Sequence, residues 1–201
     1  MIKVGITGAI GSGKTTVCNI WKRLGAAIFF ADDEAKKLMV TDEKVRGMLI
    51  NTFGSETFID NHTLNKPYLI HEAFTKGRVA ELNAIVHPAV GAAFELFCRD
   101  SENKGVDVAV KEAALLLNNG RPQNLDFVVI VESVRKIRLN RVMNRDNIDE
   151  KKFFERDENQ PHFESLHHLA DEILINNGSL AELEVKSKKL FQKLLKINLK
   201  N

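Results

Sequence analysis

The chain has 201 residues, 44% of them hydrophobic, which is enough for one domain with a buried core. Charged residues make up 28% of the chain but leave a net charge of only +2, so the charge balance favours neither nucleic acid nor an anionic membrane as a partner. No apolar run approaches the length of a membrane span, and Lys3 and Gly5 break the apolar N-terminal run, which argues against a signal peptide.

Short apolar runs and helical spacing alternate from the first residues onward. In order, they predict a strand over 2–7, a helix over 14–24, a strand over 27–31 and helices over 33–40 and 42–53. Gly25 and Gly54 each follow a predicted helix, the position in which glycine commonly ends one.

The segment from Gly54 to about Arg99 changes character and is interpreted as a helical insertion with little sheet. Its apolar residues recur at roughly helical spacing, as Tyr68, Leu69, Phe74, Val79, Leu82, Ile85 and Val86. Residues 60–62 predict a turn. His87-Pro88 is expected to interrupt the helical pattern, because proline cannot continue the hydrogen-bond ladder.

The rest of the chain returns to strands and helices. In order, it predicts a strand over 106–110, a strand over 127–131, a helix over 134–144, a polar stretch over 145–168, a strand over 173–175 and a helix from about Ser179. The lysines of the last helix are interpreted as a solvated face: Lys186, Lys188, Lys189, Lys193, Lys196 and Lys200. The alternation predicts an α/β fold, in which a parallel sheet carries helices on both faces.

Between the first strand and the first helix lies Gly8-Ala9-Ile10-Gly11-Ser12-Gly13-Lys14-Thr15, which matches G-x-x-x-x-G-K-[ST], the phosphate-binding loop. Its glycines let successive backbone N–H groups face phosphate oxygens, and the following helix adds its positive N-terminal end. The predicted nucleotide-binding residues are Gly8, Gly11, Ser12, Gly13, Lys14, Thr15 and Thr16. Lys14 is expected to reach the outer phosphates and the Thr15 hydroxyl to hold Mg²⁺.

Two other classes of nucleotide-binding protein fit less well. The loop glycines are spaced G-x-x-G-x-G rather than G-x-G-x-x-G, which excludes the dinucleotide fingerprint even though Asp32 lies near the position of its ribose-binding acid. A guanine-specific protein needs an N-K-x-D element, but Asn65-Lys66 is followed by no such acid. The D-x-x-G switch element is also absent, because no aspartate has glycine three residues on.

Acidic and basic residues are predicted to gather at the ligand edge of the sheet. Asp32 follows the strand over 27–31, so we expect it to act as the general base or to orient an acceptor hydroxyl, whereas Asp33 should face solvent. Helical spacing puts Arg138, Arg141 and Arg145 on one face, from which Arg141 and Arg145 would act on a transferring phosphoryl group. The alternative is a solvated arginine surface paired with Glu132, Asp146 and Asp149.

Over nearly its whole length the chain resembles the dephospho-coenzyme A kinase family. The matching pieces are residues 6–17, Ala31-Asp32 with Ala35, Phe53-Gly54, Leu64, Phe74, His87-Pro88, residues 138–146, Gln160, Ala170-Asp171 and residues 176–178. The resemblance implies a single P-loop kinase domain over 1–201, with a parallel five-stranded sheet in a three-layer fold. It implies a core of about 1–32, 101–140 and 169–201, a helical coenzyme A-binding region of about 33–100 and a helical lid of about 141–168.

The same resemblance implies the reaction, in which ATP phosphorylates the ribose 3′-hydroxyl of dephospho-coenzyme A, with Mg²⁺ present, to give coenzyme A and ADP. It implies catalytic roles for Asp32, Lys14, Arg141 and Arg145, and substrate contacts from Asp32, Lys66 and His87. His87 is interpreted as a structural or substrate-shaping residue rather than a catalytic one. Four positions depart from the usual family pattern: Phe30, Lys66, Asn118 and Leu166.

Two alternatives to this reaction stay open at this point: another P-loop small-molecule kinase, and a nucleotide-dependent switch protein. In either case we expect a cytoplasmic monomer or weak homo-oligomer that acts on a small molecule, without a nucleic-acid or membrane partner. Cys18 and Cys98 lie among apolar residues and form no C-x-x-C pair, which predicts buried free thiols in a reducing compartment. His167-His168 lack the partners that a zinc site requires.

Overall fold

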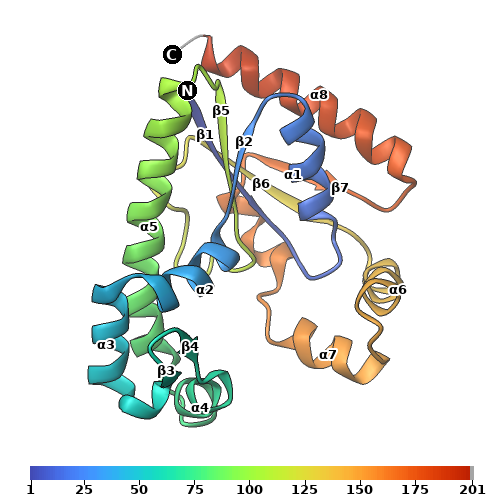
Figure 1. Cartoon of the computed structure of the whole chain (residues 1–201). Coiled ribbons are helices and arrows are strands. Elements are labelled where there is room, and N and C mark those ends of the chain that lie inside the picture. Colours follow the sequence, from blue (N-terminus) through green and yellow to red (C-terminus); the bar gives the residue numbers. More distant parts are fainter. Residues whose placement is uncertain (200–201) are drawn as a thin grey trace. The chain divides into compact units, whose positions relative to one another are not determined.

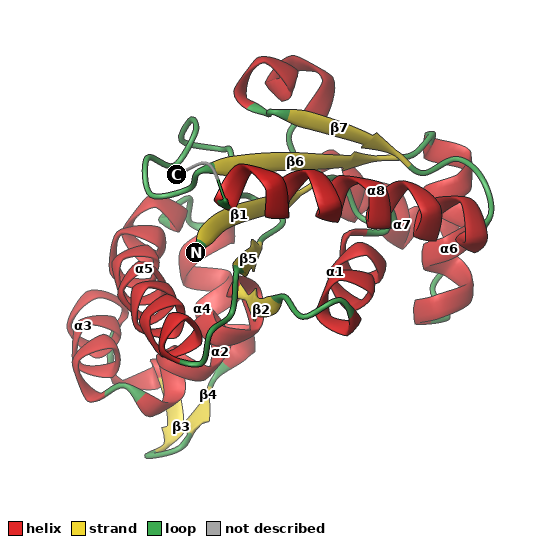
Figure 2. Ribbon diagram, turned by 90° about the horizontal axis from the view of Figure 1, so that it is seen from above, coloured by secondary structure: helices red, strands yellow, loops and turns green. Residues whose placement is uncertain are grey.

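The computed structural model describes residues 1–199, within which a five-stranded sheet has the order β2-β5-β1-β6-β7 (Figures 1 and 2). Its strands are Ile2–Thr7 (β1), Ala27–Phe30 (β2), Val108–Glu112 (β5), Phe127–Glu132 (β6) and Glu172–Ile175 (β7). Every pairing in this sheet is parallel, and helices flank it, which confirms the predicted α/β class. All six residues of β1 except Lys3 are buried, as a central strand requires.

The chain divides into two compact units, the first formed by residues 1–30 together with the chain from residue 98 onward. Besides the sheet, this unit holds four α-helices within residues 1–199, namely Lys14–Arg23 (α1), Arg135–Asp146 (α6), Glu150–Glu158 (α7) and Leu180–Asn198 (α8), and the 3₁₀ helix Phe163–Leu169. The fully buried Trp21 joins α1 to α8, because its indole N–H donates to Ser187 O at 3.0 Å and its ring lies 6.1 Å from that of Phe191.

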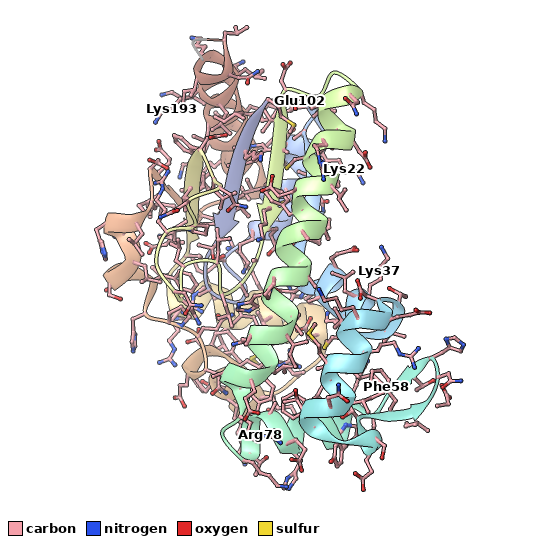
Figure 3. The ribbon with its side chains drawn as sticks, turned by 90° about the vertical axis from the view of Figure 1, so that its left-hand side faces the viewer. Lys22, Lys37, Phe58, Arg78, Glu102 and Lys193 are labelled. Atoms are coloured by element: carbon pink, nitrogen blue, oxygen red, sulfur yellow. The ribbon has the colours of Figure 1, made fainter. Side chains whose placement is uncertain are left out.

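The outer face of α8 is polar, as the sequence predicts. Lys186, Lys188, Lys189, Lys193 and Lys196 are exposed, and Lys200 lies outside the described residues. Figure 3 labels Lys193, whose ammonium is 2.7 Å from a carboxylate oxygen of Glu172. No helix within residues 1–199 is both long and apolar enough to cross a bilayer.

The second unit, residues 31–97, is mainly helical. It contains α2 (Ala31–Thr41), α3 (Glu43–Phe53), α4 (Lys66–Ile70), a π-helical turn (His71–Thr75) and the first part of α5 (Val79–Asn103), with a small hairpin of β3 (Phe58–Asp60) and β4 (Thr63–Leu64). Val45, Leu49 and Phe53 of α3 are buried against the helices that follow. Arg78, labelled in Figure 3, precedes α5 and donates to Thr52 O at 2.7 Å.

Three local predictions are wrong. Pro88 does not interrupt the helix but lies inside the 25-residue α5. The proline removes one backbone donor, but burial of Ile85, Val86 and Val90 stabilises the helix on both sides of it. The strand expected at 106–110 begins at Val108, because the Val106 N–H donates to Ser101 O and closes the end of α5. The strand expected to reach residue 31 ends at Phe30, so α2 begins two residues earlier than the sequence predicts.

Candidate active site

The phosphate-loop motif lies between the end of β1 and the start of α1, as predicted (Figure 1). Gly8, Gly11 and Gly13 have φ angles of 144°, 77° and 107°, in the region that disfavours side chains. A Cβ at Gly8 would collide with the backbone oxygen of Val131, and a Cβ at Gly13 would collide with the amide of Asn176. Glycine is therefore required both by the turn and by close neighbours on β6 and after β7.

The carbonyl groups of the loop are held by donors from several elements. The Lys14 ammonium donates to Gly8 O at 2.7 Å and to Ala9 O at 3.4 Å, and the Ser12 N–H donates to Ala9 O at 3.1 Å. The buried Asn176 amide donates to Ser12 O at 2.7 Å. Because these carbonyl oxygens already accept hydrogen bonds, the loop can present its backbone N–H groups to a bound anion.

A polar atom without a partner lies inside this loop. Ser12 is fully buried, and its Oγ has no hydrogen-bond partner among the described residues. Together with the glycine turns, the Lys14 ammonium and the N-terminus of α1, this donor set fits a polyphosphate. Lys14, Thr15 and Thr16 open α1, so their side chains begin at the anion-binding end of the helix.

Arg138 contacts the loop from α6. Its guanidinium is mostly buried, with the side chain 11% exposed, and donates to Ser133 O at 3.0 Å and to Ile10 O at 3.2 Å. It also pairs with Asp157 of α7, whose side chain is 9% exposed. On the other side of the same loop residue, the Ile10 N–H donates to the Gln160 side-chain oxygen at 2.6 Å.

Arg141 and Arg145 lie on the same helix in different surroundings. Arg141 is half-buried and donates to Ser133 Oγ and to the Asn176 side-chain oxygen, both at 3.3 Å. Burial lowers the pKa of Arg141. Arg145 is exposed and pairs with Asp146 at 2.7 Å, and this hydrogen bond raises the pKa of Arg145.

The expected acidic partners of the arginines are present only in part. Asp146 pairs with Arg145 and also with Arg156, at 3.0 Å. Glu132, in contrast, contacts His167 Nε2, and the Asp149 side chain accepts from the Lys152 N–H and caps α7. The acid that binds Arg138 and Arg135 is Asp157, which lies in the stretch interpreted from the sequence as simply polar.

A pocket of about 480 Å³ opens beside the loop, within the first unit. Its wall includes Ala9 of the loop, residues 131–135 at the carboxyl end of β6, Arg138 of α6 and residues 160–164 after α7. In parallel α/β sheets ligands bind at the carboxyl ends of the strands, and this pocket lies at that edge.

The other predicted site residues belong to the second unit. Asp32 is exposed in the first turn of α2, two residues after β2, and Asp33 is 76% exposed and pairs with Lys36 at 2.9 Å. Lys66 is exposed at the start of α4, and His87 is exposed in α5 beside the buried Val86. The structure thus brings together the loop, Arg138, Arg141 and Asn176 in the first unit, whereas Asp32, Lys66 and His87 belong to the second unit.

Three contacts of the loop have no role in the sequence-based site: Arg138, Gln160 and Asn176. The signal was present, since all three occur in the pieces that carry the family resemblance. Spacing alone could not assign them, because each acts through a tertiary contact to a backbone group.

A parallel sheet with the phosphate loop after its first strand, and with arginines on a helix that contacts this loop, matches the architecture of P-loop kinases. The sequence model of dephospho-CoA kinase matches residues 2–182. The chain therefore belongs to the dephospho-CoA kinase family, whose reaction, the ATP-dependent phosphorylation of dephospho-CoA, is the final step of CoA biosynthesis. The predicted family, kinase class and reaction are confirmed.

Individual relatives agree with this assignment. The chain is 39% identical to a dephospho-CoA kinase from Salinibacter ruber over 192 residues, which cover 95% of this chain and 96% of the relative. It is 30% identical to one from Corynebacterium glutamicum, with 94% and 97% covered. Among solved structures, TT1252 from Thermus thermophilus has a TM-score of 0.77 at 27% identity and covers 96% of this chain and 97% of its own.

Proposed function

We propose that this chain transfers the γ-phosphoryl group of ATP to the ribose 3′-hydroxyl of dephospho-CoA through the predicted site residues. The observation that carries this proposal is the phosphate loop, whose Gly8, Ala9 and Ser12 carbonyls are bonded by Lys14, Ser12 and Asn176. Residues Gly8, Gly11, Ser12, Gly13, Lys14, Thr15 and Thr16 bind the nucleotide. The transition state of phosphoryl transfer spreads negative charge over the transferring oxygens, so positioning and electrostatics carry most of the catalysis.

In the proposed mechanism Lys14 faces the outer phosphates, and Arg141 and Arg145 act on the transferring group. Asp32 orients the acceptor hydroxyl and takes its proton as the oxygen–phosphorus bond forms and the bond from the γ-phosphorus to the leaving ADP oxygen breaks. The Thr15 hydroxyl would hold Mg²⁺, which would neutralise charge on the phosphate oxygens. The assignment is supported by the exposure of Asp32 and by its position in the chain, two residues after the carboxyl end of β2.

We assign coenzyme A binding to the second unit and closure over the nucleotide to a lid within the first unit. The helical region of about 33–100 binds coenzyme A, with Lys66 and His87 as contacts, and residues of about 141–168 form the lid. The exposure of Lys66 and His87 is compatible with ligand contact. We also propose a cytoplasmic location, because Cys18 and Cys98 are buried and form no disulfide within residues 1–199, as is usual in a reducing compartment.

An acceptor panel tests this function against its alternatives. ATP consumption is measured with dephospho-CoA, with adenosine, with nucleoside monophosphates and with no acceptor. We expect turnover with dephospho-CoA to exceed the others by about a thousandfold or more, since a site built to bind one polar acceptor discriminates strongly. Preference for a nucleoside or nucleotide would indicate another small-molecule kinase, and tight nucleotide binding with slow, acceptor-independent turnover would indicate a switch protein.

A further inference from the structure

The peptide groups on both sides of Ile10, within the phosphate loop, are held by side chains from outside the loop. The Ile10 N–H donates to Gln160 Oε1 at 2.6 Å, and the Ile10 carbonyl accepts from Arg138 Nη1 at 3.2 Å. Arg138 in turn pairs with Asp157. We call Gln160, Arg138 and Asp157 the Ile10 clamp.

Two of the three clamp residues come from the end of α7 and the residues just after it. Asp157 lies in the last turn of α7, and Gln160 follows the helix by two residues. Helix α7 packs against α6, because Phe153 is fully buried beside Arg138 and the Arg135 guanidinium lies 4.6 Å from the Phe154 ring centre. The clamp therefore ties the phosphate loop to a segment about 150 residues away in sequence.

The loop needs such support more than an ordinary turn does. Gly8, Gly11 and Gly13 all adopt positive φ, and glycine loses more conformational freedom on ordering than other residues do. An ordered loop binds phosphate without having to pay this entropy at the moment of binding. Ile10 lies between Gly8 and Gly11, so fixing its two peptide groups restrains the turn that these two glycines form.

We infer that Gln160, together with the Arg138–Asp157 pair, positions the phosphate loop for nucleotide binding by holding the backbone of Ile10. This inference rests on the proposed function only in taking the loop as the nucleotide site. The clamp residues are positioning residues, because Gln160 and Arg138 contact the loop through the backbone of Ile10, while Asp157 pairs with Arg138 and Arg135. Nucleotide affinity thereby depends on the conformation of the α7 end.

The test replaces Gln160 with methionine, which has a similar length and lacks the amide oxygen. In the protein labelled with ¹⁵N-isoleucine, we expect the Ile10 amide of Gln160→Met to exchange with solvent about tenfold faster than in the wild type, since a lost hydrogen bond exposes the donor to local opening. Calorimetry should show ADP–Mg²⁺ binding weakened about tenfold. KM for ATP should rise, while KM for dephospho-CoA stays within about twofold, a difference below the worth of one hydrogen bond.

Two further variants give the experiment its controls. Gln160→Glu keeps an acceptor oxygen at the same length, so Ile10 exchange in the nucleotide-free protein should stay near the wild-type rate. Gln192→Met makes the same substitution at an exposed position of α8, outside the clamp and the proposed site, and should leave both Ile10 exchange and ADP affinity unchanged. Unchanged Ile10 exchange in Gln160→Met, or faster exchange with unchanged ADP affinity, would overturn the inference. If Lys14→Ala also left ADP affinity unchanged, the phosphate-loop assignment would fail instead.

Discussion

The ammonium of Lys14 lies across the phosphate loop, 2.7 Å from the carbonyl oxygen of Gly8. In the proposed reaction this charge stabilises the outer phosphates as the phosphoryl group transfers. We expect Lys14→Ala to lower kcat/KM by about 10²–10³-fold, the usual loss for one electrostatic stabiliser. Steady-state kinetics check this, with circular dichroism as the folding control. Near wild-type turnover in a folded variant would contradict the loop assignment.

Asp32 and Asp33 form a matched pair for testing the general base. Asp33 is bonded to Lys36 at 2.9 Å, whereas Asp32 occupies the first turn of α2 directly after the strand. Asp32→Asn keeps the shape and removes basicity, so kcat should fall about a hundredfold while ATP binding is retained. Asp33→Asn should change kcat little. Asp32 loses its role if its Asn variant keeps more than about a third of the wild-type kcat at saturation.

Arg141 and Arg145 are expected to act on the transferring phosphoryl group, although their side chains have different partners in the structure. Arg141 already contacts Asn176 beside the loop, whereas Arg145 must leave its exposed pair with Asp146. Alanine at either position should lower kcat by about a hundredfold, with a smaller effect on dephospho-CoA binding, because the contact is made in the transition state. Titration calorimetry and saturation kinetics separate the two effects. Poor acceptor binding with normal kcat would assign these arginines to substrate binding.

At the residue scale, the sequence predicts the loop and the arginine cluster but not how they are joined. The motif assigns Lys14, and helical spacing groups Arg138 with Arg141. Arg138 donates to the Ile10 carbonyl, the Ile10 N–H donates to Gln160, and Asn176 donates to the Ser12 carbonyl, so these hydrogen bonds link residues 128 to 164 positions apart. No local pattern encodes such a contact, because each partner is a backbone group without a sequence signature.

At the scale of elements, α5 shows how packing overrides a local signal. Pro88 removes one donor from the helix, yet the buried residues around it keep the helix continuous. In the stretch over 145–168 the sequence misses a helix instead. Its many charged residues obscure the helical pattern of α7, whose buried residue is Phe153. Helices with a clear apolar stripe, such as α1 and α8, are predicted well because burial of that stripe drives their formation.

The proline in α5 gives a stability prediction. Pro88 is exposed, so Pro88→Ala restores a backbone donor without disturbing the core, and we expect a gain of about 1–3 kcal/mol in the free energy of unfolding. Gly91→Ala in the same helix is the comparison, because its added Cβ meets nothing within 4 Å, and it should gain about 0.5–1 kcal/mol. Urea denaturation measures both. A destabilised Pro88→Ala would mean that the helix is packed around a required proline kink.

At the scale of the whole chain, alternating strands and helices predict a parallel sheet but not the order of its strands. The observed order places β5 between β2 and β1, although 77 residues separate the end of β2 from the start of β5. That pairing spans the entire helical unit, and the sequence indicates the unit only as a change of pattern. The family match over residues 2–182 covers both units, so the kinase assignment applies to the sheet and to the insertion together.

The central claim is that this chain adds a phosphoryl group to the ribose 3′-hydroxyl of dephospho-CoA. The most direct measurement is NMR of the reaction product formed from ATP and dephospho-CoA, read through phosphorus–proton coupling on the ribose. The account predicts a new phosphate coupled to the ribose H3′, formed in equal amount to ADP, and formed about 10²–10³-fold more slowly with Lys14→Ala. ADP formed without a phosphorylated acceptor, or a new phosphate coupled to the ribose H2′ instead of H3′, would contradict it.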